Sequence, residues 1–440
     1  MGNFPDGVFF EKVLGAAWRG GVPERIRGAA IDSRKISPGE IFVALKTERR
    51  DGHDFLEAAR ERGAAGALVS RFVPASPLPQ LVVPDAARAL REIAAAHRRE
   101  RCGNVRVFGV TGSVGKTSTK DLLARVLSEE GSTLATEKNL NNTLGVPLTL
   151  LKIDPAAHRF AVVEAGVSVP GEMEILAAMI RPDVAVVTNI FPAHLEGFGT
   201  LENIAQEKSA LCRAVSPDGK SVFPAELLRY ESFRALGVGA VPVQTAPREL
   251  DDGFAFGGFA LKNVSRGLAE NAALVAAAAA DFVSEEKIRR AFAAHRPSAF
   301  RGETRERLGG GKIFVDCYNA SPASMLDSAR AFAKRFPAEP AGTPRLFVLG
   351  GMGELGSASA ALHFEVGEKL PLDAATDTLA LFGGDAARIG EGAVARGFPR
   401  ERVRAFSDIG ALRDFAAAFR GNVMFKGSRA FALERAVPED

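Results

Sequence analysis

Cysteine is scarce in this chain, which has only three cysteines among 440 residues. Cys102, Cys212 and Cys317 are far apart and odd in number, which argues against a disulfide framework and favours a reducing compartment. We expect all three to be small hydrophobic residues of the interior.

An excess of charge and long apolar runs are also missing. The 56 Lys and Arg residues against 53 Asp and Glu leave a formal net charge of +3, which gives no electrostatic footprint for nucleic acid. The alanine-rich run 272–280 is far too short to span a bilayer, and residues 1–13 lack a basic segment followed by an apolar one. Asp6 does not fit a myristoylation site. We therefore expect a cytoplasmic protein with no transmembrane segment and no nucleic-acid partner, and a monomer by default.

What is present is the composition of an ordinary globular protein, with 46% hydrophobic and 25% charged residues. The length is too great for one core and predicts two or three domains. From residue 105 to about 300, short apolar runs alternate with helical stretches, which is the pattern of βαβ units around a parallel sheet. A third block from about residue 305 predicts a second doubly wound sheet. The predicted fold class is therefore α/β.

The segment VRVFGVTGSVGKTST, residues 105–119, is the most informative part of the chain. An apolar run that suits a buried strand leads into a glycine-rich turn, and a helix follows with its positive dipole end facing the turn. This context predicts a phosphate-binding loop rather than a structural turn, although Val110 replaces the first glycine of the general motif. Lys116 would reach the outer phosphates of a nucleotide, and the Thr117 hydroxyl would ligate Mg²⁺. The predicted nucleotide contacts are Thr111, Gly112, Ser113, Gly115, Lys116, Thr117 and Ser118.

Polar residues follow two further strands of the central block. Glu164 closes the strand in RFAVVEAG, and His194 lies in the loop after PDVAVVTNI. Ligands of a parallel sheet gather at the carboxyl ends of its strands, so both side chains could face Mg²⁺ held by the nucleotide. A carboxylate suits that hard cation, whereas histidine suits it less. The alternatives are a helix-capping glutamate and a surface histidine.

Lys208 lies in the middle of an apolar stripe on a predicted helix, residues 201–215. An unpaired ammonium is disfavoured there, so the pKa of Lys208 should fall. Three outcomes remain open. The lysine extends to the surface, it pairs with Glu164 or a phosphate, or, once neutral, it reacts with carbon dioxide to form a carbamate that a second Mg²⁺ would bind. The sequence does not choose between the last two.

Seven segments of the chain resemble, in this order, motifs of the Mur ligase family: TGSVGKTS, NLNNTLGVPLTLL, AVVEAG, AHLEGFGTLENIAQEK, VDCYNASPASM, GMGELG and KGSR. The N-terminal DSRKISPGEIFVALKTERRDGHDF resembles the uridine-nucleotide domain of that family, so the similarity covers nearly the whole chain. It implies a small α/β domain for the UDP-linked substrate at 1–102 and a central P-loop ATPase with a mostly parallel sheet at 103–302. A C-terminal Rossmann-like domain at 303–440 would close over ATP and bind a dipeptide.

The resemblance also implies an activity. This activity is ATP-dependent amide formation through an acyl phosphate, joining D-alanyl-D-alanine to UDP-N-acetylmuramoyl-tripeptide in peptidoglycan biosynthesis, with two Mg²⁺ ions. The implied catalytic residues are Lys116, Lys208 and His194, and the implied metal ligands are Thr117, Glu164, His194 and a carbamylated Lys208. Asp316, Tyr318 and Asn319 would approach ATP, with Arg301 ahead of them, and the substrates would contact Ser33, Arg34, Asn141, Asn142, Lys426 and Arg429. By residue type alone, the asparagines and the Ser33–Arg34 pair are equally typical of turns.

The chain departs from the family pattern at two places. The family usually shows a His-Asn pair and a further Asn near the adenine, whereas this chain reads GLAENAALV, with only Asn271 nearby and out of register. Gly351 stands where an aspartate is common. Two rival functions remain. The first is another amide ligase, such as a folylpolyglutamate synthase, and the second is a nucleotide-binding regulatory protein without turnover. The sequence does not indicate whether the third residue of the tripeptide is lysine or diaminopimelate.

Overall fold

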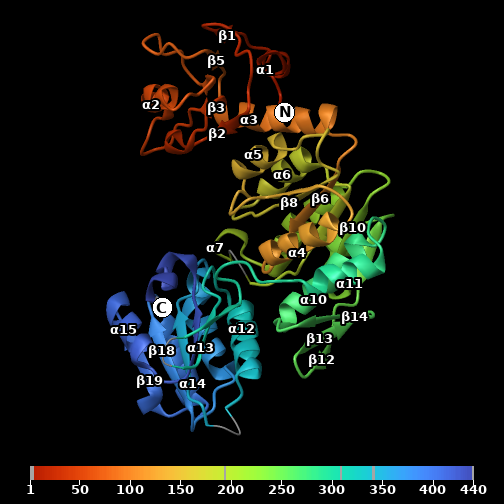
Figure 1. Cartoon of the computed structure of the whole chain (residues 1–440). Coiled ribbons are helices and arrows are strands. Elements are labelled where there is room, and N and C mark those ends of the chain that lie inside the picture. The colour runs from red at the N-terminus through yellow and green to blue at the C-terminus, as the bar shows by residue number, and fades with distance from the viewer. Residues whose placement is uncertain (1–3, 193–194, 308–309, 339–341, 439–440) are drawn as a thin grey trace.

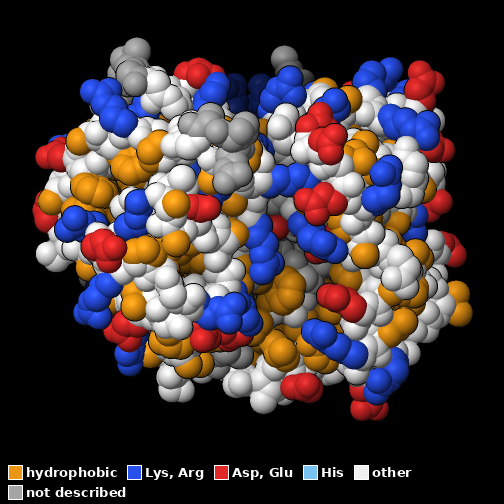
Figure 2. Space-filling model, turned by 90° about the horizontal axis from the view of Figure 1, so that it is seen from below, with side chains coloured by type: hydrophobic (Ala, Val, Ile, Leu, Met, Phe, Trp, Pro, Cys, Tyr) orange, Lys and Arg blue, Asp and Glu red, His pale blue; other side chains and the backbone are white. Residues whose placement is uncertain are grey.

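The computed structural model describes residues 4–192, 195–307, 310–338 and 342–438. It is an α/β protein of three domains, with the N-terminal domain at one end of the molecule and the C-terminal domain at the other (Figure 1). The expected fold class is thereby confirmed. Figure 2, seen from the C-terminal end, shows basic and acidic side chains interspersed over a face that is hollowed near its centre.

The N-terminal domain is built on a five-stranded sheet in the order β1-β5-β4-β3-β2, in which only the β1–β5 pair is antiparallel. One predicted strand, residues 41–46, is shorter than expected: β3 ends at Val43, and after it Leu45 accepts a hydrogen bond from Gly52 across a turn. The elements are α1 (Gly7–Leu14), β1 (Trp18–Arg19), β2 (Gly28–Ala30), β3 (Glu40–Val43), α2 (Leu56–Glu61), β4 (Gly66–Val69), β5 (Gln80–Val82) and α3 (Ala86–Arg101).

The central domain has a six-stranded, all-parallel sheet in the order β11-β10-β9-β6-β8-β7 and a separate antiparallel sheet of β12, β13 and β14. Alternate residues of β6 pack into two cores, because helices cover both faces: Val107 lies in one and Phe108 in the other. The strands are β6 (Arg106–Thr111), β7 (Thr133–Ala135), β8 (Phe160–Glu164), β9 (Val184–Val187), β10 (Lys220–Pro224), β11 (Ala240–Val243), β12 (Arg248–Leu250), β13 (Gly253–Phe256) and β14 (Phe259–Lys262). The helices are α4 (Lys116–Ser128), α5 (Gly145–Leu151), α6 (Glu172–Ile180), α7 (Leu195–Phe198), α8 (Leu201–Arg213), α9 (Glu231–Arg234), α10 (Arg266–Ala279) and α11 (Glu285–Ala293).

The C-terminal domain has the second sheet that the sequence predicts, in the order β15-β16-β20-β17-β18-β19, with β15 as its one antiparallel edge strand. Phe347 and Val348 of β17 again face different cores, so the sheet is covered on both sides. The elements are β15 (Glu303–Glu306), β16 (Lys312–Val315), α12 (Pro322–Arg335), β17 (Arg345–Gly350), α13 (Ser359–Lys369), β18 (Asp377–Phe382), α14 (Ala386–Ala395), β19 (Val403–Phe406), α15 (Ile409–Ala418) and β20 (Asn422–Lys426).

The three cysteines are buried and free, as expected. Burial raises the pKa of the Cys102 thiol to about 11, and those of Cys212 and Cys317 to about 12, so the thiols remain protonated at neutral pH. Within the described ranges, no helix is both long enough and apolar enough to cross a bilayer.

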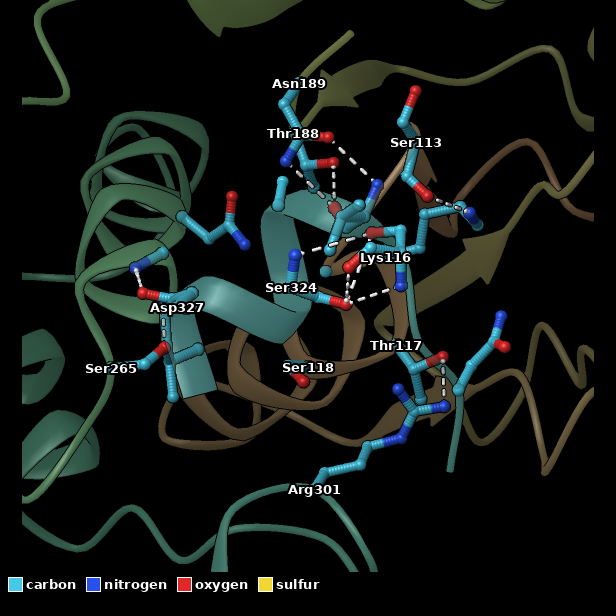
Figure 3. Close-up of a pocket in the computed structure, with 18 of the residues that line it drawn as sticks. Ser113, Lys116, Thr117, Ser118, Thr188, Asn189, Ser265, Arg301, Ser324 and Asp327 are labelled. Atoms are coloured by element: carbon cyan, nitrogen blue, oxygen red, sulfur yellow. Dashed lines mark hydrogen bonds between the residues drawn. The ribbon is translucent and has the colours of Figure 1, made fainter. Parts of the chain in front are cut away.

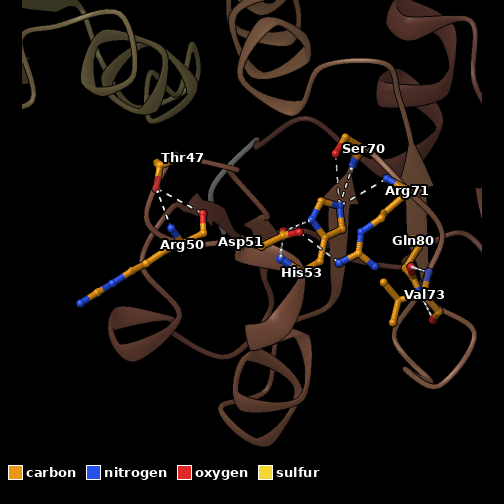
Figure 4. Close-up of polar contacts among 8 residues, drawn as sticks. All are labelled: Thr47, Arg50, Asp51, His53, Ser70, Arg71, Val73 and Gln80. Atoms are coloured by element: carbon orange, nitrogen blue, oxygen red, sulfur yellow. Dashed lines mark hydrogen bonds and ion pairs between the residues drawn. The ribbon is translucent and has the colours of Figure 1, made fainter.

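A polar network joins the segment before α2 to the end of β4 (Figure 4). His53 Nδ1 lies 2.5 Å from Asp51 Oδ1, and His53 Nε2 accepts the backbone N–H groups of Ser70 at 3.0 Å and Arg71 at 3.3 Å. Because Nε2 accepts, the ring proton is on Nδ1 and is donated to Asp51. The Arg71 guanidinium also donates to Asp51 at 3.1 Å. Asp51 therefore holds together two segments that are distant in the sequence.

We expect Asp51→Asn to destabilise the N-terminal domain, by about 1 kcal/mol as for loss of a helix cap. The His53 backbone N–H, the His53 ring and Arg71 hold the pKa of Asp51 well below its ordinary value of 3.8. The stabilisation that ionised Asp51 gives the wild type should therefore be complete above about pH 4. It should be lost as the pH falls further toward the folded-state pKa of Asp51. Thermal melts from pH 7 to pH 3 should show the gap between wild type and variant closing below pH 4, with the exposed neighbour Asp54→Asn as control. A gap independent of pH would contradict this role.

Candidate active site

The predicted phosphate loop connects β6 to α4, as the sequence indicates. Gly112 has φ 144° and Gly115 has φ 81°, both in the region that favours glycine. A side chain at either position would also collide with a neighbour: a Cβ on Gly112 would lie 1.9 Å from Thr188 Oγ1, and one on Gly115 would lie 2.3 Å from Asn271 Nδ2. The loop therefore depends on glycine at these two positions, and Val110 is accommodated inside the preceding strand.

The loop is held in place by the end of β9, as Figure 3 shows. Asn189 Oδ1 accepts the Val114 N–H at 2.9 Å, and Asn189 Nδ2 donates to Val114 O at 3.0 Å. The Thr188 hydroxyl donates to the same carbonyl at 2.6 Å, and the Ser113 hydroxyl donates to Phe191 O at 3.0 Å. These contacts fix the loop before any ligand binds, which is the preorganisation that phosphate recognition requires.

Lys116 folds over the loop, where Nζ donates to the carbonyls of Gly112 at 2.8 Å and Ser113 at 3.2 Å. Burial lowers its pKa, while the nearby Glu164 carboxylate acts in the opposite direction. The ammonium therefore lies between the loop and a carboxylate, where a bound polyphosphate would replace the carbonyls as its partner.

Glu164, at the end of β8, is 1% exposed. Its Oε1 accepts the Thr117 hydroxyl at 3.1 Å and the Asn141 amide at 2.8 Å. Its Oε2 is buried and has no hydrogen-bond partner within the described part of the chain. A buried carboxylate oxygen without a partner is costly, and a divalent cation is the partner that carboxylates prefer. The donor set therefore fits Mg²⁺, although no group of three His, Cys, Asp or Glu side chains occurs among the described residues.

Lys208 points inward from α8 and is 1% exposed, so the expectation of a buried lysine is confirmed and the surface alternative is wrong. Among the described residues, Nζ makes no hydrogen bond or ion pair, so the pairing with Glu164 is not formed. Burial, followed by the charge of Lys116, lowers the pKa of Lys208 well below its ordinary value. Lys208 is not among the described residues that line the cavity described next.

A cavity of about 930 Å³ extends from the phosphate loop to the C-terminal domain. Arg301 crosses it: the guanidinium donates to the Thr117 hydroxyl at 3.1 Å and lies 3.9 Å from the centre of the Tyr318 ring. Lys426 Nζ pairs with Asp316 Oδ2 at 2.9 Å and donates to Asn319 O at 2.8 Å. The wall residues that the sequence singled out are Ser113, Gly115, Lys116, Thr117, Ser118, Asn141, Asn142, Glu164, Asn271, Arg301, Asp316, Tyr318, Asn319 and Lys426.

Other predicted site residues lie elsewhere. The Thr111 hydroxyl is fully buried and donates to Ala165 O at 2.8 Å, so the side chain lies behind the loop and not on the cavity wall. Arg429 pairs with Glu434 at 2.7 Å, and its guanidinium lies 5.8 Å from the centre of the Tyr318 ring. Ser33 and Arg34 are in the N-terminal domain, where Arg34 and its neighbours lower the pKa of Asp32 to about 2. His194 lies outside the described residues.

The structure also explains one departure from the family pattern. A Cβ on Gly351 would lie 2.7 Å from the ring of Phe431, so the aromatic side chain occupies the room that an aspartate would need. Asp327 on α12 is one of several wall residues that the sequence analysis did not single out. No local motif marks it, because it reaches the cavity only through the packing of two domains.

The site combines three features: a phosphate loop at the carboxyl edge of an all-parallel sheet, a carboxylate oxygen beside it without a hydrogen-bond partner among the described residues, and a second α/β domain over the cleft. Together they define a P-loop nucleotide-binding protein of several domains. The chain matches the family models described as Mur ligase family, catalytic domain (residues 25–98), Mur ligase middle domain (110–239) and Mur ligase, glutamate ligase domain (300–429). It therefore belongs to the Mur ligase family.

Similar proteins cover almost the whole chain. The UDP-N-acetylmuramoyl-tripeptide–D-alanyl-D-alanine ligase of Bacillus subtilis is 32% identical over 94% of this chain and 93% of its own length. A crystal structure of MurF from Acinetobacter baumannii has a TM-score of 0.84 at 28% identity, covering 99% of this chain and 98% of that one. MurF ligase from Thermotoga maritima in complex with ADP has a TM-score of 0.77 at 27% identity, covering 93% and 96%.

Proposed function

We propose that the protein is an ATP-dependent ligase that joins D-alanyl-D-alanine to UDP-N-acetylmuramoyl-tripeptide, forming the UDP-linked pentapeptide precursor of peptidoglycan. The observation that most supports this proposal is Glu164 Oε2, which is buried beside the phosphate loop and has no hydrogen-bond partner among the described residues. It supplies a cation site where the nucleotide phosphates would lie. The relatives that match the chain over nearly its full length are ligases with this activity. The buried free cysteines support a cytoplasmic location.

In the proposed reaction, the terminal carboxylate of the tripeptide attacks the γ-phosphorus of ATP, the bond to the bridging oxygen breaks, and ADP leaves. The amine of D-alanyl-D-alanine then attacks the acyl carbon, loses a proton and displaces phosphate. A carboxylate is a poor electrophile, and phosphorylation supplies its leaving group, so the residues needed act mainly by position and charge. Lys116 and Arg301 supply positive charge at the phosphates, and the C-terminal domain shields the acyl phosphate from water.

Mg²⁺ would be held by Thr117 and Glu164, and would supply charge neutralisation at the phosphate oxygens. His194 is proposed as a further ligand on the family resemblance. The proposed substrate contacts are Asn141 and Asn142 on the cavity wall, Lys426 and Arg429 for the dipeptide, and Ser33 and Arg34 for the uridine nucleotide.

Lys208 is proposed to carry a carbamate: carbon dioxide adds to the neutral amine, and one proton is released. The support is a fully buried lysine without a partner among the described residues, whose lowered pKa favours the neutral form that reacts. The carbamate would bring a negative charge toward the phosphate loop, as a second Mg²⁺ requires.

We expect Lys208→Met to lower turnover and to raise thermal stability in bicarbonate-free buffer. Methionine keeps the length of the side chain without a buried amine, and relief of about 1 kcal/mol corresponds to roughly 2–4 °C. Lys120→Met is the matched contrast, because buried Lys120 donates to Thr136 O at 2.9 Å and should lose stability. In ¹³C-bicarbonate, a carbamate signal should be present in wild type and absent in Lys208→Met. No such signal, together with a stability loss in Lys208→Met, would contradict the carbamate.

The activity is tested by incubating the protein with Mg-ATP, UDP-N-acetylmuramoyl-tripeptide and D-alanyl-D-alanine, omitting each in turn. Phosphate release that requires both co-substrates, with UDP-muramoyl-pentapeptide detected by mass spectrometry, is the expected result. Parallel reactions with the lysine and the diaminopimelate tripeptides identify the preferred third residue. Nucleotide binding without phosphate release under any condition would favour a regulatory protein instead.

A further inference from the structure

The linker between the central and C-terminal domains is the segment 294–302, which follows α11 and precedes β15. Near its end, Phe300 O accepts the Tyr318 N–H of the C-terminal domain at 3.2 Å. Phe300 has φ 61° and Gly302 has φ 82°, so the residues on both sides of Arg301 are in the left-handed region. A bulky residue persists in that region only where surrounding contacts fix it. The contacts that fix the linker therefore decide where Arg301 lies.

On the side of the central domain, the linker is fixed by α4. The Ser298 hydroxyl donates to Asp121 Oδ2 at 2.6 Å, and Ser298 O accepts the Arg301 N–H at 3.1 Å. Asp121 also forms an ion pair with Lys120, whose buried ammonium donates to Thr136 O at 2.9 Å. The Asp121 carboxylate is thus held in place itself, and it holds the turn that leads to Arg301 against α4.

Thr117 and Asp121 are four residues apart on α4 and therefore lie on the same face of the helix. Two residues of the linker contact this face one helical turn apart. Ser298 contacts Asp121, and the Arg301 guanidinium donates to Thr117 Oγ1 at 3.1 Å (Figure 3). The pKa of Lys116, which burial lowers, is lowered further by the nearby charge of Arg301. The guanidinium therefore lies at the end of α4 where the outer phosphates of a nucleotide would bind.

We propose that Asp121 and Ser298 are positioning residues for the nucleotide: their hydrogen bond places the linker so that Arg301 reaches the phosphates of ATP. Neither is among the described residues that line the cavity, so they act through Arg301 and not on the ligand. An arginine that is already held in its binding position loses less conformational freedom when a phosphate binds, which raises affinity. This inference deepens the proposed function and rests on it, because it assumes that ATP is bound.

A double-mutant cycle on Ser298 and Arg301 separates positioning from a merely structural contact. Dissociation constants for the Mg²⁺ complex of β,γ-imido-ATP, a non-hydrolysable analogue, are measured by calorimetry on the full-length protein. Ser298→Ala removes only the hydroxyl and should weaken binding about five-fold, and Arg301→Ala should weaken it roughly ten-fold or more. The double variant should bind no more weakly than Arg301→Ala, because no guanidinium is left to be positioned.

Three further variants test the same hydrogen bond. Ser298→Thr keeps a hydroxyl and should retain most of the wild-type affinity. Asp121→Ala should weaken binding at least as much as Ser298→Ala, and combining these two should cause no further loss. Ser128→Ala is the matched control: it removes an exposed hydroxyl of α4 that donates to Ala124 O at 2.7 Å, and it should leave the affinity unchanged.

Unchanged affinity in Ser298→Ala, or a loss that is just as large in the Arg301→Ala background, would overturn the inference and leave the Asp121–Ser298 contact as a structural tie. The binding assay needs neither the tripeptide nor the dipeptide. Coupling between Ser298 and Arg301 in a protein that binds the analogue but catalyses no ligation would count against the proposed function alone. Independent effects in an active ligase would count against this inference alone, and a wild type that does not bind the analogue would overturn both.

Discussion

Lys116→Ala is expected to reduce phosphate release by at least roughly 10²–10³-fold, as removal of one charge-stabilising donor does in other enzymes. In the structure, Nζ lies within 2.8 Å of Gly112 O and 3.2 Å of Ser113 O, inside the loop that would cradle the phosphates. Charge accumulates on the transferring phosphoryl group, and this partly buried ammonium offsets it in a site of lower dielectric than water. The measurement is single-turnover phosphate release at saturating substrates, which separates chemistry from binding.

Lys152→Ala is the matched control, because Lys152 lies in the same domain and forms an ion pair with Glu137 at 2.8 Å, away from the cavity wall. It should keep wild-type turnover. Thermal melts of both variants show whether the fold is retained. Full phosphate release by a folded Lys116→Ala protein would remove Lys116 from the mechanism.

Glu164→Gln has the second-largest expected effect, a loss of roughly 10²-fold or more in turnover at low millimolar Mg²⁺. The substitution preserves shape but offers an amide N–H₂ or a neutral oxygen where the buried Oε2 now lies without a partner. Raising the Mg²⁺ concentration should restore part of the activity, because the lost interaction is with the cation. The Thr117 and Asn141 contacts to the other oxygen can persist, so the fold should survive.

The exposed Glu174→Gln on α6 serves as control for the loss of one carboxylate from the same domain. A Glu164→Gln protein whose activity and Mg²⁺ dependence match those of the wild type would show that the orphaned oxygen has no role in cation binding. A fall in activity that is insensitive to Mg²⁺ would indicate a structural role instead.

Local sequence patterns predicted much of the fold and the centre of the site. The phosphate loop is encoded within fifteen residues, and its glycines are required by backbone angles and by contacts with Thr188 and Asn271. The inward orientation of Lys208 follows from helical periodicity alone, because a residue in an apolar stripe must face the core. The alternation of apolar runs predicted the parallel sheet of the central domain and the mostly parallel sheet of the C-terminal domain.

Contacts between distant segments could not be read in this way. Asp327 follows Gly267 by 60 residues, yet the two are hydrogen-bonded because α12 packs against α10. Likewise, the burial of Thr111 behind the loop depends on β8. The Thr111 hydroxyl donates to the carbonyl of Ala165, the residue that follows this strand. The family resemblance supplied roles for Arg301 and Tyr318, but the stacking of the two side chains 3.9 Å apart is a result of tertiary structure.

The central claim is that the tripeptide carboxylate is activated as an acyl phosphate, and oxygen transfer tests it most directly. UDP-N-acetylmuramoyl-tripeptide labelled with ¹⁸O in its terminal carboxylate is converted with Mg-ATP and D-alanyl-D-alanine, and the released phosphate is analysed by mass spectrometry. One labelled oxygen should appear in each phosphate formed, because the carboxylate oxygen leaves with the phosphoryl group. Phosphate released in step with the pentapeptide product but free of the label would contradict the account.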